Sequence, residues 1–268
     1  MQEMKGKVVV ITGATSGIGQ VAAEKLAEMG ARIVQVARDR ERGEAAMRQL
    51  RERSPGAAHS IWYADLSRLS EMRRVTAEIA ASEPRIDVLI NNAGAIFSTR
   101  QATEDGLERT FALNHMSYFM LAHEFRERLV ASAPARIVNT ASDAHEPFTL
   151  DFDDLQSEKA YQGNFWQWVR YGGPAFKVYG RSKLCNILFT RELARRLAGT
   201  GVTANSLHPG FVATRFGDQT RGLLSFGIRF AKRFAITPEK GAETLVYLAS
   251  SPEVAGVTGE YFYKCRPA

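Results

Sequence analysis

The chain contains 268 residues, 45% of them hydrophobic, which is enough apolar material for a large core and excludes a disordered protein. No apolar run approaches the ~20 residues that a membrane span requires. The N-terminal residues carry no apolar signal segment, and the two cysteines suggest no disulfide framework, so we expect a cytoplasmic protein. The net charge of +6 admits nucleic-acid binding, but the arginines are scattered along the chain, so no nucleic-acid partner is expected.

The N-terminal part of the chain predicts a strand, a glycine-rich turn, a helix and a second strand. Residues 7–12 form a β-branched apolar run that is typical of a strand buried on both faces. The turn has the spacing Gly-x-x-x-Gly-x-Gly, and the helix after it ends at Gly30, before a strand over 31–37. Such a turn lets the backbone approach a pyrophosphate at the helix N-terminus. The alternative, a tight turn without a ligand, is disfavoured by the buried strand and helix around it.

The end of the second strand indicates which dinucleotide this turn would bind. The strand ends at the neutral Ala37, and Arg38 and Asp39 follow. An acidic residue at the strand end would bind the ribose 2′-hydroxyl of NAD, whereas an arginine suits the 2′-phosphate of NADP. This pattern favours NADP(H), with NAD(H) as the alternative. In the competing interpretation Arg38 is solvated and Asp39 pairs with a nearby arginine.

Strands and helices alternate along the rest of the chain. We expect strands over 59–63, 86–90, 135–140, 202–207 and 259–262. We expect helices over 41–53, 105–131 and 238–250, and one ending at residue 83 that Ser67 or Ser70 could cap. The alternation predicts a single-domain α/β Rossmann fold, with a doubly wound parallel sheet of about seven strands and helices on both faces. Ligands bind such sheets at the carboxyl ends of the strands, where Gly13, Arg38, Asp65, Asn91, Ser142 and Pro209 lie.

Two long stretches show no clear strand or helix pattern. Residues 146–178 combine an acidic patch with many aromatic side chains, and residues 216–235 mix apolar and basic side chains. Long loops in compact domains are often lids or binding loops, so we predict that both stretches contact substrate. For 216–235 the alternative is a helix that lies on a membrane surface.

Tyr179 and Lys183 are candidates for acid/base chemistry. They run directly into residues 184–189, an apolar-rich segment without Gly or Pro, which predicts a helix with Tyr179 in its first turn. Residues four apart share a helix face, so the phenol and the ammonium can meet. A nearby cation lowers a tyrosine pKa from its usual value of about 10, which would let Tyr179 act near neutral pH. The alternative is a surface pair, because this spacing also arises by chance.

Taken together, these motifs resemble the short-chain dehydrogenase/reductase family. They are the turn over 12–19, Asn91-Asn92-Ala93-Gly94, Asn114, Ser142, Tyr179-x-x-x-Lys183 and Pro209-Gly210. Within the family the chain is most similar to the retinol-dehydrogenase-like branch, through segments 135–139, 143–145, 152–156 and 182–189. The resemblance implies an NADP(H)-dependent oxidoreductase that transfers a hydride between the nicotinamide and a carbonyl or alcohol of a moderately apolar substrate.

The resemblance also implies a catalytic role for four residues. Tyr179 would give or take the proton of the substrate oxygen, and Lys183 would lower its pKa and hold the nicotinamide ribose. Ser142 would hydrogen-bond the carbonyl oxygen and stabilise the charge that develops there. Asn114 would interrupt its helix and anchor a water molecule that relays protons past Lys183.

A second set of residues would bind the cofactor. The resemblance implies Asp65 near the adenine, Asn91 near the adenosine ribose and Thr214 at the nicotinamide amide. The full set of implied contacts is Gly13, Thr15, Ser16, Gly17, Ile18, Gly19, Arg38, Asp65, Leu66, Asn91, Ala93, Gly94, Tyr179, Lys183, Pro209, Gly210, Val212 and Thr214.

Substrate contacts are expected from side chains of the two long stretches and the loop after Ser142. They are His145, Phe165, Trp166, Trp168, Tyr171, Phe176 and Phe216. In the alternative interpretation His145 bonds the backbone and the aromatic side chains cover the core. No cluster of His, Cys and Asp has metal-binding spacing, so we expect no metal.

We also expect a homo-oligomer, and two other functions are alternatives to the oxidoreductase. The family resemblance implies a homodimer or homotetramer, formed by pairing the helices that hold Asn114 and Tyr179. One alternative function is a non-catalytic, NADP-sensing regulator, which the tyrosine-lysine pair argues against. The other is an enoyl reductase, a branch whose tyrosine lies seven residues before the lysine, where this chain has Phe176.

Overall fold

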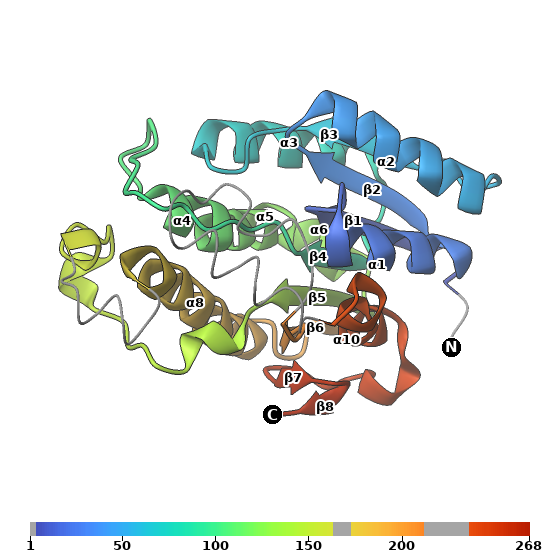
Figure 1. Ribbon diagram of the computed structural model, residues 1–268. Coiled ribbons are helices and arrows are strands. Elements are labelled where there is room, and N and C mark those ends of the chain that lie inside the picture. The colour runs from blue at the N-terminus through green and yellow to red at the C-terminus, as the bar shows by residue number, and fades with distance from the viewer. Residues whose placement is uncertain (1–3, 163–172, 212–235) are drawn as a thin grey trace.

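A single sheet organises the computed structural model, which describes residues 4–162, 173–211 and 236–268 (Figure 1). Its eight strands run in the order β3-β2-β1-β4-β5-β6-β7-β8. The strands are β1 (Val8–Thr12), β2 (Arg32–Ala37), β3 (Ser60–Tyr63), β4 (Val88–Asn91), β5 (Ala135–Thr140), β6 (Val202–His208), β7 (Tyr261–Tyr263) and β8 (Arg266–Pro267). All neighbours pair in parallel except β7 and β8, which are antiparallel. The predicted Rossmann fold is confirmed, with β8 added, a strand too short to leave a sequence pattern.

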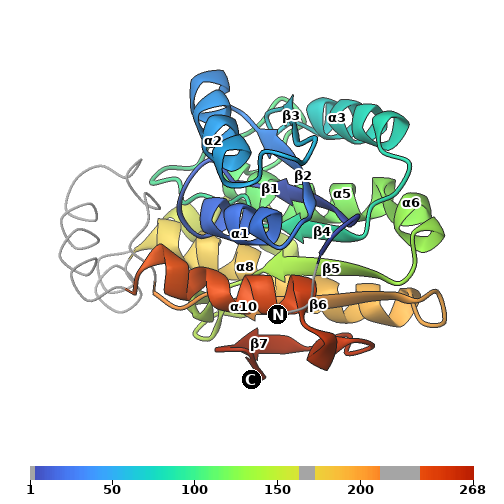
Figure 2. The same ribbon diagram turned by 90° about the vertical axis from the view of Figure 1, so that its right-hand side faces the viewer.

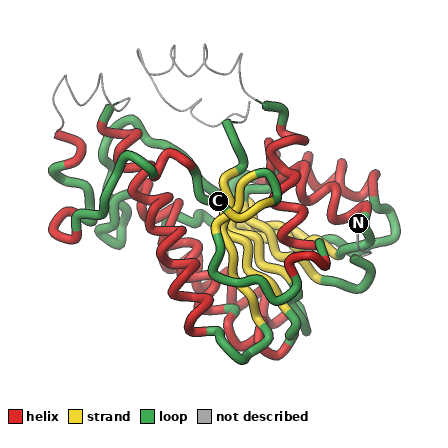
Figure 3. The backbone as a smooth tube through the Cα atoms, turned by 90° about the horizontal axis from the view of Figure 1, so that it is seen from below, coloured by secondary structure: helices red, strands yellow, loops and turns green. Residues whose placement is uncertain are grey.

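Helices cover both faces of this sheet. They are α1 (Gly17–Glu28), α2 (Arg40–Arg53), α3 (Leu69–Ser82), α4 (Arg109–Phe111), the π-helix η1 (Ala112–Met116), α5 (Ser117–Glu124), α6 (Arg126–Ala131), α8 (Pro174–Arg196) and α10 (Pro238–Ser250). Helices α1, α2 and α10 lie on one face and α3, α5, α6 and α8 on the other (Figure 2). Figure 3 shows helices on both sides of the strands. None of the helices described combines the length and the apolarity needed to cross a membrane.

Strand β1 shows why the sheet has two apolar faces. Val9 and Ile11 pack into the core formed with α1, α2 and α10, whereas Val8 and Val10 pack into the core formed with α3, α5 and α8. Successive side chains of a strand point to opposite faces, so a strand covered on both sides must be apolar at every position. The buried strand predicted for residues 7–12 is confirmed over Val8–Thr12, while Lys7 is partly exposed and precedes the strand.

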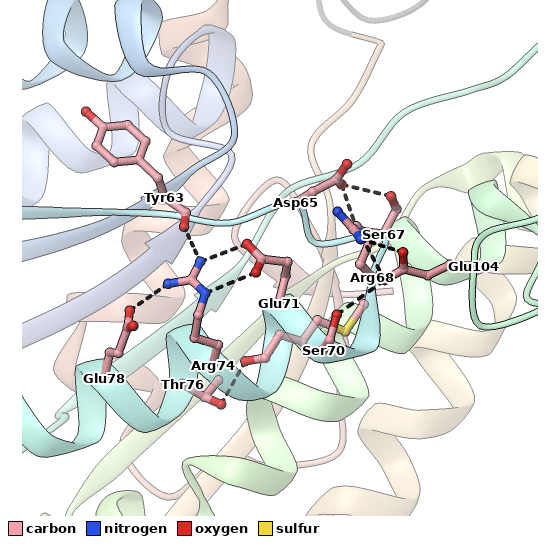
Figure 4. Close-up of polar contacts among 11 residues, drawn as sticks. Tyr63, Asp65, Ser67, Arg68, Ser70, Glu71, Arg74, Thr76, Glu78 and Glu104 are labelled. Carbon is pink, nitrogen blue, oxygen red and sulfur yellow. Dashed lines mark hydrogen bonds and ion pairs between the residues drawn. The ribbon is translucent and has the colours of Figure 1, made fainter.

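The start of α3 differs from the prediction, because neither Ser67 nor Ser70 caps it. The backbone N–H of Leu69 instead donates to Asp105 Oδ2 at 2.9 Å, from a loop distant in sequence. Ser67 bonds the carboxylate of Asp65, and Ser70 lies 3.3 Å from a Glu104 carboxylate oxygen (Figure 4). These contacts fix the loop after β3, in which Asp65 lies.

Two helix boundaries were also predicted wrongly. The helix expected from residue 105 begins at Arg109, because the Glu108 carboxylate caps it by accepting hydrogen bonds from the N–H groups of Thr110 and Phe111. Helix α8 begins at Pro174, its first residue, so Tyr179 lies in the second turn rather than the first. Proline suits a first helical position because it lacks the N–H that would have no partner there.

Candidate active site

The glycine-rich turn after β1 packs tightly against the end of β4. Asn92 Nδ2 donates to the backbone oxygens of Thr12 (3.2 Å) and Gly13 (3.0 Å), and Thr12 Oγ1 accepts from the N–H groups of Asn92 and Ala93. A Cβ on Gly13 would lie 2.7 Å from Ala93 Cα, and one on Gly19 would overlap Asn92 Nδ2. The φ of Gly13 is +68°, which favours glycine. The conformation of the turn thus also depends on Asn92, a residue that the Asn-Asn-Ala-Gly motif in the sequence could have indicated.

The N-terminus of α1, directly after this turn, has no side-chain cap. Ser16 occupies the N-cap position without a side-chain cap hydrogen bond, and the first turn of α1 has no acidic residue. By contrast Asp39 caps α2 and Thr237 caps α10. Within the described part of the chain, α1 therefore presents free N–H groups and a positive dipole end, which fit a pyrophosphate.

The end of β2 lies beside this turn and carries positive charge. The Asp39 carboxylate caps α2 by accepting from the backbone N–H of Arg42 at 2.9 Å. Arg42 Nη2 in turn donates to Ser16 Oγ at 3.3 Å, and Arg38 is exposed. The exposed Arg38 leaves the competing interpretation open, and the Arg42 guanidinium beside Ser16 suits a phosphate group.

The other expected cofactor residues vary in how accessible they are. Asp65 is partly exposed and Gly94 is exposed, whereas Leu66 is buried. Asn91 is fully buried and its Nδ2 donates to Asn139 Oδ1 at 2.9 Å, so its side chain faces the sheet interior rather than a ribose. Gly210, after Pro209, has a φ of +87°. Val212 and Thr214 lie outside the described residues.

Asn114 lies at the interruption of its helix, in the π-helical turn η1. Its Oδ1 accepts from the N–H of Ala95 at 2.9 Å, and its Nδ2 donates to the Ala95 oxygen (2.9 Å) and to Ser182 Oγ (3.1 Å). The buried side chain thus joins the segment after β4 to α8. The predicted interruption is confirmed, while the proton-relaying water stays a prediction.

Lys183 and Tyr179 are buried on one face of α8. Lys183 Nζ donates to the Thr140 backbone oxygen at 2.8 Å and lies 5.7 Å from the centre of the Tyr179 ring. Burial lowers the pKa of Lys183 to about 7. Burial also raises the pKa of Tyr179 above its usual value, although a hydrogen bond with Ser142 opposes this. The direction is therefore opposite to the expected lowering, because desolvation outweighs the hydrogen bond with Ser142.

Ser142 lies between the end of β5 and the phenol of Tyr179. It begins the short 3-10 turn η2 (Asp143–His145), where its Oγ accepts from the N–H of Ala144 at 3.2 Å. The same oxygen is hydrogen-bonded with Tyr179. The sheet and α8 therefore bring Ser142, Tyr179 and Lys183 into one site, as their sequence positions predicted.

An apolar wall surrounds the ring of Tyr179. Its members in the described chain are Ile96, Ala144, Ala175 and, partly buried, Tyr161 and Phe176. The rings of Phe176 and Tyr179 have centroids 6.3 Å apart. A Cβ on Gly180 would overlap the Ala144 oxygen and the Phe148 ring, so glycine allows α8 to approach this wall closely.

The expected substrate residues are only partly described. His145 Nδ1 lies 2.6 Å from the Ser142 backbone oxygen, which matches the alternative of a backbone-bonded loop histidine. The remaining expected aromatic contacts, Phe165, Trp166, Trp168, Tyr171 and Phe216, lie outside the described residues. Among the residues that are described, no group of three or more His, Cys, Asp or Glu side chains could hold a metal.

Comparison with known proteins gives consistent matches. The family model described as short chain dehydrogenase matches residues 7–149, and one described as Enoyl-(Acyl carrier protein) reductase matches residues 168–264. Human (Homo sapiens) Retinol dehydrogenase 14 is 43% identical over 98% of this chain and 80% of its own length. Human Retinol dehydrogenase 13 is 40% identical over 96% of this chain and 76% of its own length.

Solved structures agree with these matches. The Pseudomonas aeruginosa RhlG/NADP active-site complex is 26% identical with a TM-score of 0.74, covering 97% of this chain and 95% of that one. A short chain dehydrogenase from Burkholderia cenocepacia J2315 in complex with NADP is 22% identical with a TM-score of 0.73, covering 97% and 96%, and shows the shared fold. The chain therefore belongs to the short-chain dehydrogenase/reductase family, oxidoreductases that act on CH–OH and C=O groups with NAD(P), and is similar to retinol dehydrogenases.

Proposed function

We propose that this protein is an NADP(H)-dependent oxidoreductase for a carbonyl or alcohol of a moderately apolar substrate, with Tyr179 as general acid/base. The observation that carries the proposal is the buried Tyr179 phenol, hydrogen-bonded with Ser142 at the carboxyl edge of the sheet. The open N-terminus of α1 lies at the same edge and fits the dinucleotide pyrophosphate. When bound there, the nicotinamide supplies or accepts the hydride.

The raised pKa of Tyr179 suits proton donation to a carbonyl oxygen. The phenol holds its proton at neutral pH, so during reduction its O–H bond breaks as the substrate oxygen gains the proton. Oxidation of an alcohol needs the phenolate instead. Rising pH should therefore lower the rate of reduction and increase the rate of oxidation. The apolar wall around the Tyr179 ring limits water beside the reacting oxygen.

Arg38 is proposed to select NADPH over NADH by binding the 2′-phosphate. We expect Arg38→Ala to lower kcat/KM for NADPH by roughly 10- to 100-fold, because a charge-assisted hydrogen bond to phosphate is lost. The value for NADH should change less than about 3-fold, since NADH has no group for Arg38 to bind. Steady-state kinetics with both cofactors measure the difference.

Arg40→Ala is the matched control for this prediction. Its guanidinium lies over the Tyr63 ring, 4.5 Å from the centroid, and removing it deletes one positive charge at the start of α2, two residues after Arg38. We expect a much smaller loss with NADPH. Equal losses with NADPH and NADH in Arg38→Ala would contradict a role for Arg38 in cofactor choice.

A cofactor-oxidation screen tests the function itself. NADPH and NADH oxidation would be followed with aliphatic, aromatic, retinoid and steroid carbonyls, the retinoids because the relatives are named retinol dehydrogenases. Reduction of at least one carbonyl with NADPH is the expected result. Tight NADPH binding without any turnover would instead favour the NADP-sensing regulator.

An enoyl thioester belongs in the same screen, because a model described as Enoyl-(Acyl carrier protein) reductase matches residues 168–264. Against this alternative, Phe176 occupies the position seven residues before Lys183 and packs against Tyr179. Turnover of the thioester without any carbonyl reduction would replace the proposed function by enoyl reduction.

We further propose a homo-oligomer that buries an apolar surface formed by α5 and α8. Phe119 and Leu188 are 40% and 45% exposed, and the Phe119 ring lies 5.8 Å from that of Phe189. We expect Leu188→Glu to convert a dimer or tetramer into monomers in light scattering, because a buried unpaired charge is costly. A wild-type monomer at micromolar concentration would contradict this proposal. The cytoplasmic location stays a prediction.

A further inference from the structure

Three neighbours compete for the hydroxyl of Ser142, which has one hydrogen and two lone pairs. Its Oγ accepts from the N–H of Ala144 at 3.2 Å, lies 3.1 Å from Asp143 Oδ1 and is hydrogen-bonded with Tyr179. A hydrogen bond from His208 lowers the pKa of Asp143, so the carboxylate is ionised at neutral pH and can only accept. The Ser142 hydrogen therefore points to Asp143, and the remaining lone pair of Ser142 faces Tyr179.

Asp143 is held in this position by both ring nitrogens of His208. The backbone N–H of Asp143 donates to Nδ1 at 3.3 Å, and Nε2 lies 3.2 Å from Asp143 Oδ2. A neutral imidazole with its hydrogen on Nε2 satisfies both contacts. His208 is buried at the end of β6, and its ring packs on Tyr263 with centroids 5.0 Å apart. The carboxylate beside Ser142 is thus fixed by the end of a strand.

Asp143 also acts on Tyr179 through its charge. The described titratable groups near the phenol are Lys183 on α8, Tyr118 on α5, Tyr261 on β7 and Asp143 after β5. Tyr161, in the short turn Ala160–Gln162, packs against the same apolar wall. Burial raises the pKa of Tyr179 most; a hydrogen bond that Ser142 gives to the phenol oxygen would lower it, and the Asp143 charge raises it. A hydrogen that Ser142 gives to Asp143 cannot also stabilise a phenolate. Asp143 therefore opposes the phenolate both by its charge and by occupying the hydrogen of Ser142.

We propose that Asp143 is a positioning residue that holds the Ser142 hydroxyl hydrogen away from Tyr179 and so sets the pH at which Tyr179 changes from acid to base. This inference rests on the proposed role of Tyr179 in carbonyl reduction. During reduction the Ser142 hydroxyl must rotate from Asp143 to stabilise the oxygen of the substrate. The pair of Asp143 and His208 thereby couples the end of β6 to the acid/base chemistry on α8.

Asp143→Asn tests the inference, because the amide keeps the shape and an accepting oxygen but carries no charge. We expect the pKa in the pH profiles of kcat, for both carbonyl reduction and alcohol oxidation, to fall by roughly 0.5 to 1 pH unit. Reduction needs the phenol, so its decline begins at lower pH. Oxidation needs the phenolate, so its rise also begins at lower pH. A purely structural role for Asp143 would lower kcat without moving either profile.

Glu146→Gln is the matched control, since it removes a negative charge at the end of the same turn. The Glu146 backbone N–H bonds the Asp143 oxygen, and its side chain is exposed. Because this carboxylate is not one of the groups acting on Tyr179, we expect a shift below about 0.2 pH unit. Equal shifts in the two variants would indicate general electrostatics and overturn the specific role of Asp143.

A second measurement needs no turnover. The ultraviolet absorbance of tyrosinate, taken as the difference between each protein and its Tyr179→Phe partner, titrates Tyr179 alone. We expect Tyr179 to ionise at lower pH in Asp143→Asn than in the wild type. Unchanged ionisation would overturn the inference, whether or not a substrate is known. A shifted ionisation in a protein that reduces no carbonyl would support the inference and contradict the proposed function.

Discussion

Tyr179→Phe is expected to lower kcat by about 10³-fold while leaving the affinity for NADPH unchanged. Phenylalanine keeps the ring that packs against Phe176 and the apolar wall, and it removes only the proton-carrying oxygen. The substrate oxygen would then have to take its proton from water, in a site whose Tyr179 position is buried. Single-turnover kinetics and a fluorescence titration with NADPH separate chemistry from binding.

Tyr161→Phe is the matched control for this loss. Tyr161 packs against the same wall, and its hydroxyl lies 3.3 Å from both the Phe97 oxygen and Glu108 Oε1. Its removal should change kcat by less than about 3-fold, with a loss of stability near 1 kcal/mol from the missing hydrogen bonds. If Tyr179→Phe reduced a substrate of the wild type at the wild-type rate, this would contradict the role of Tyr179 as general acid/base.

Gly19→Ala is expected to abolish dinucleotide binding and to destabilise the protein. The added methyl would overlap Asn92 Nδ2 and the Gly13 oxygen, both fixed by the hydrogen bond between them at 3.0 Å. Overpacking of this kind costs roughly 1–3 kcal/mol of unfolding free energy. The turn must also move, which takes the N-terminus of α1 away from the position that suits a pyrophosphate. Denaturant unfolding and NADPH titration measure the two effects.

Gly56→Ala separates a local clash from a general effect of removing a glycine. Gly56 is exposed, and a Cβ there would meet nothing within 4 Å. We expect unchanged NADPH binding and a stability equal to or slightly above that of the wild type, because alanine restricts the unfolded chain. Intact NADPH binding by Gly19→Ala would contradict the proposed role of the turn.

The sequence predicted the features that depend on local pattern. Buried parallel strands such as β1 are continuously apolar, and a glycine-rich turn between a strand and a helix has a specific spacing. The helix start at Pro174 was missed, although proline favours the first helical position, because the aromatic residues around it suggested a loop. The carboxyl-edge location of Ser142 followed from the alternation of strands and helices.

Features that depend on strand order could not be read from the sequence. The register that pairs Thr140 with Leu207 brings Asp143 beside His208, residues far apart in the chain. The cap of α3 by Asp105 likewise joins distant segments. The pKa of Tyr179 depends on burial that only packing decides, so spacing from Lys183 gave the wrong direction.

The π-helical turn at Asn114 lets one continuous helical segment meet two geometric demands. A π-helical turn holds an extra residue compared with an α-helix, so it changes by about 100° the direction of side chains before it relative to those after it. After the turn, Leu121 and Phe125 point into the core beneath the sheet. At the turn, Asn114 points to Ala95 and Ser182 instead. In a regular α-helix with the same core contacts, the side chain of residue 114 would point in another direction. The π-helical turn therefore lets Asn114 face Ala95 and Ser182 while Leu121 and Phe125 keep their places in the core.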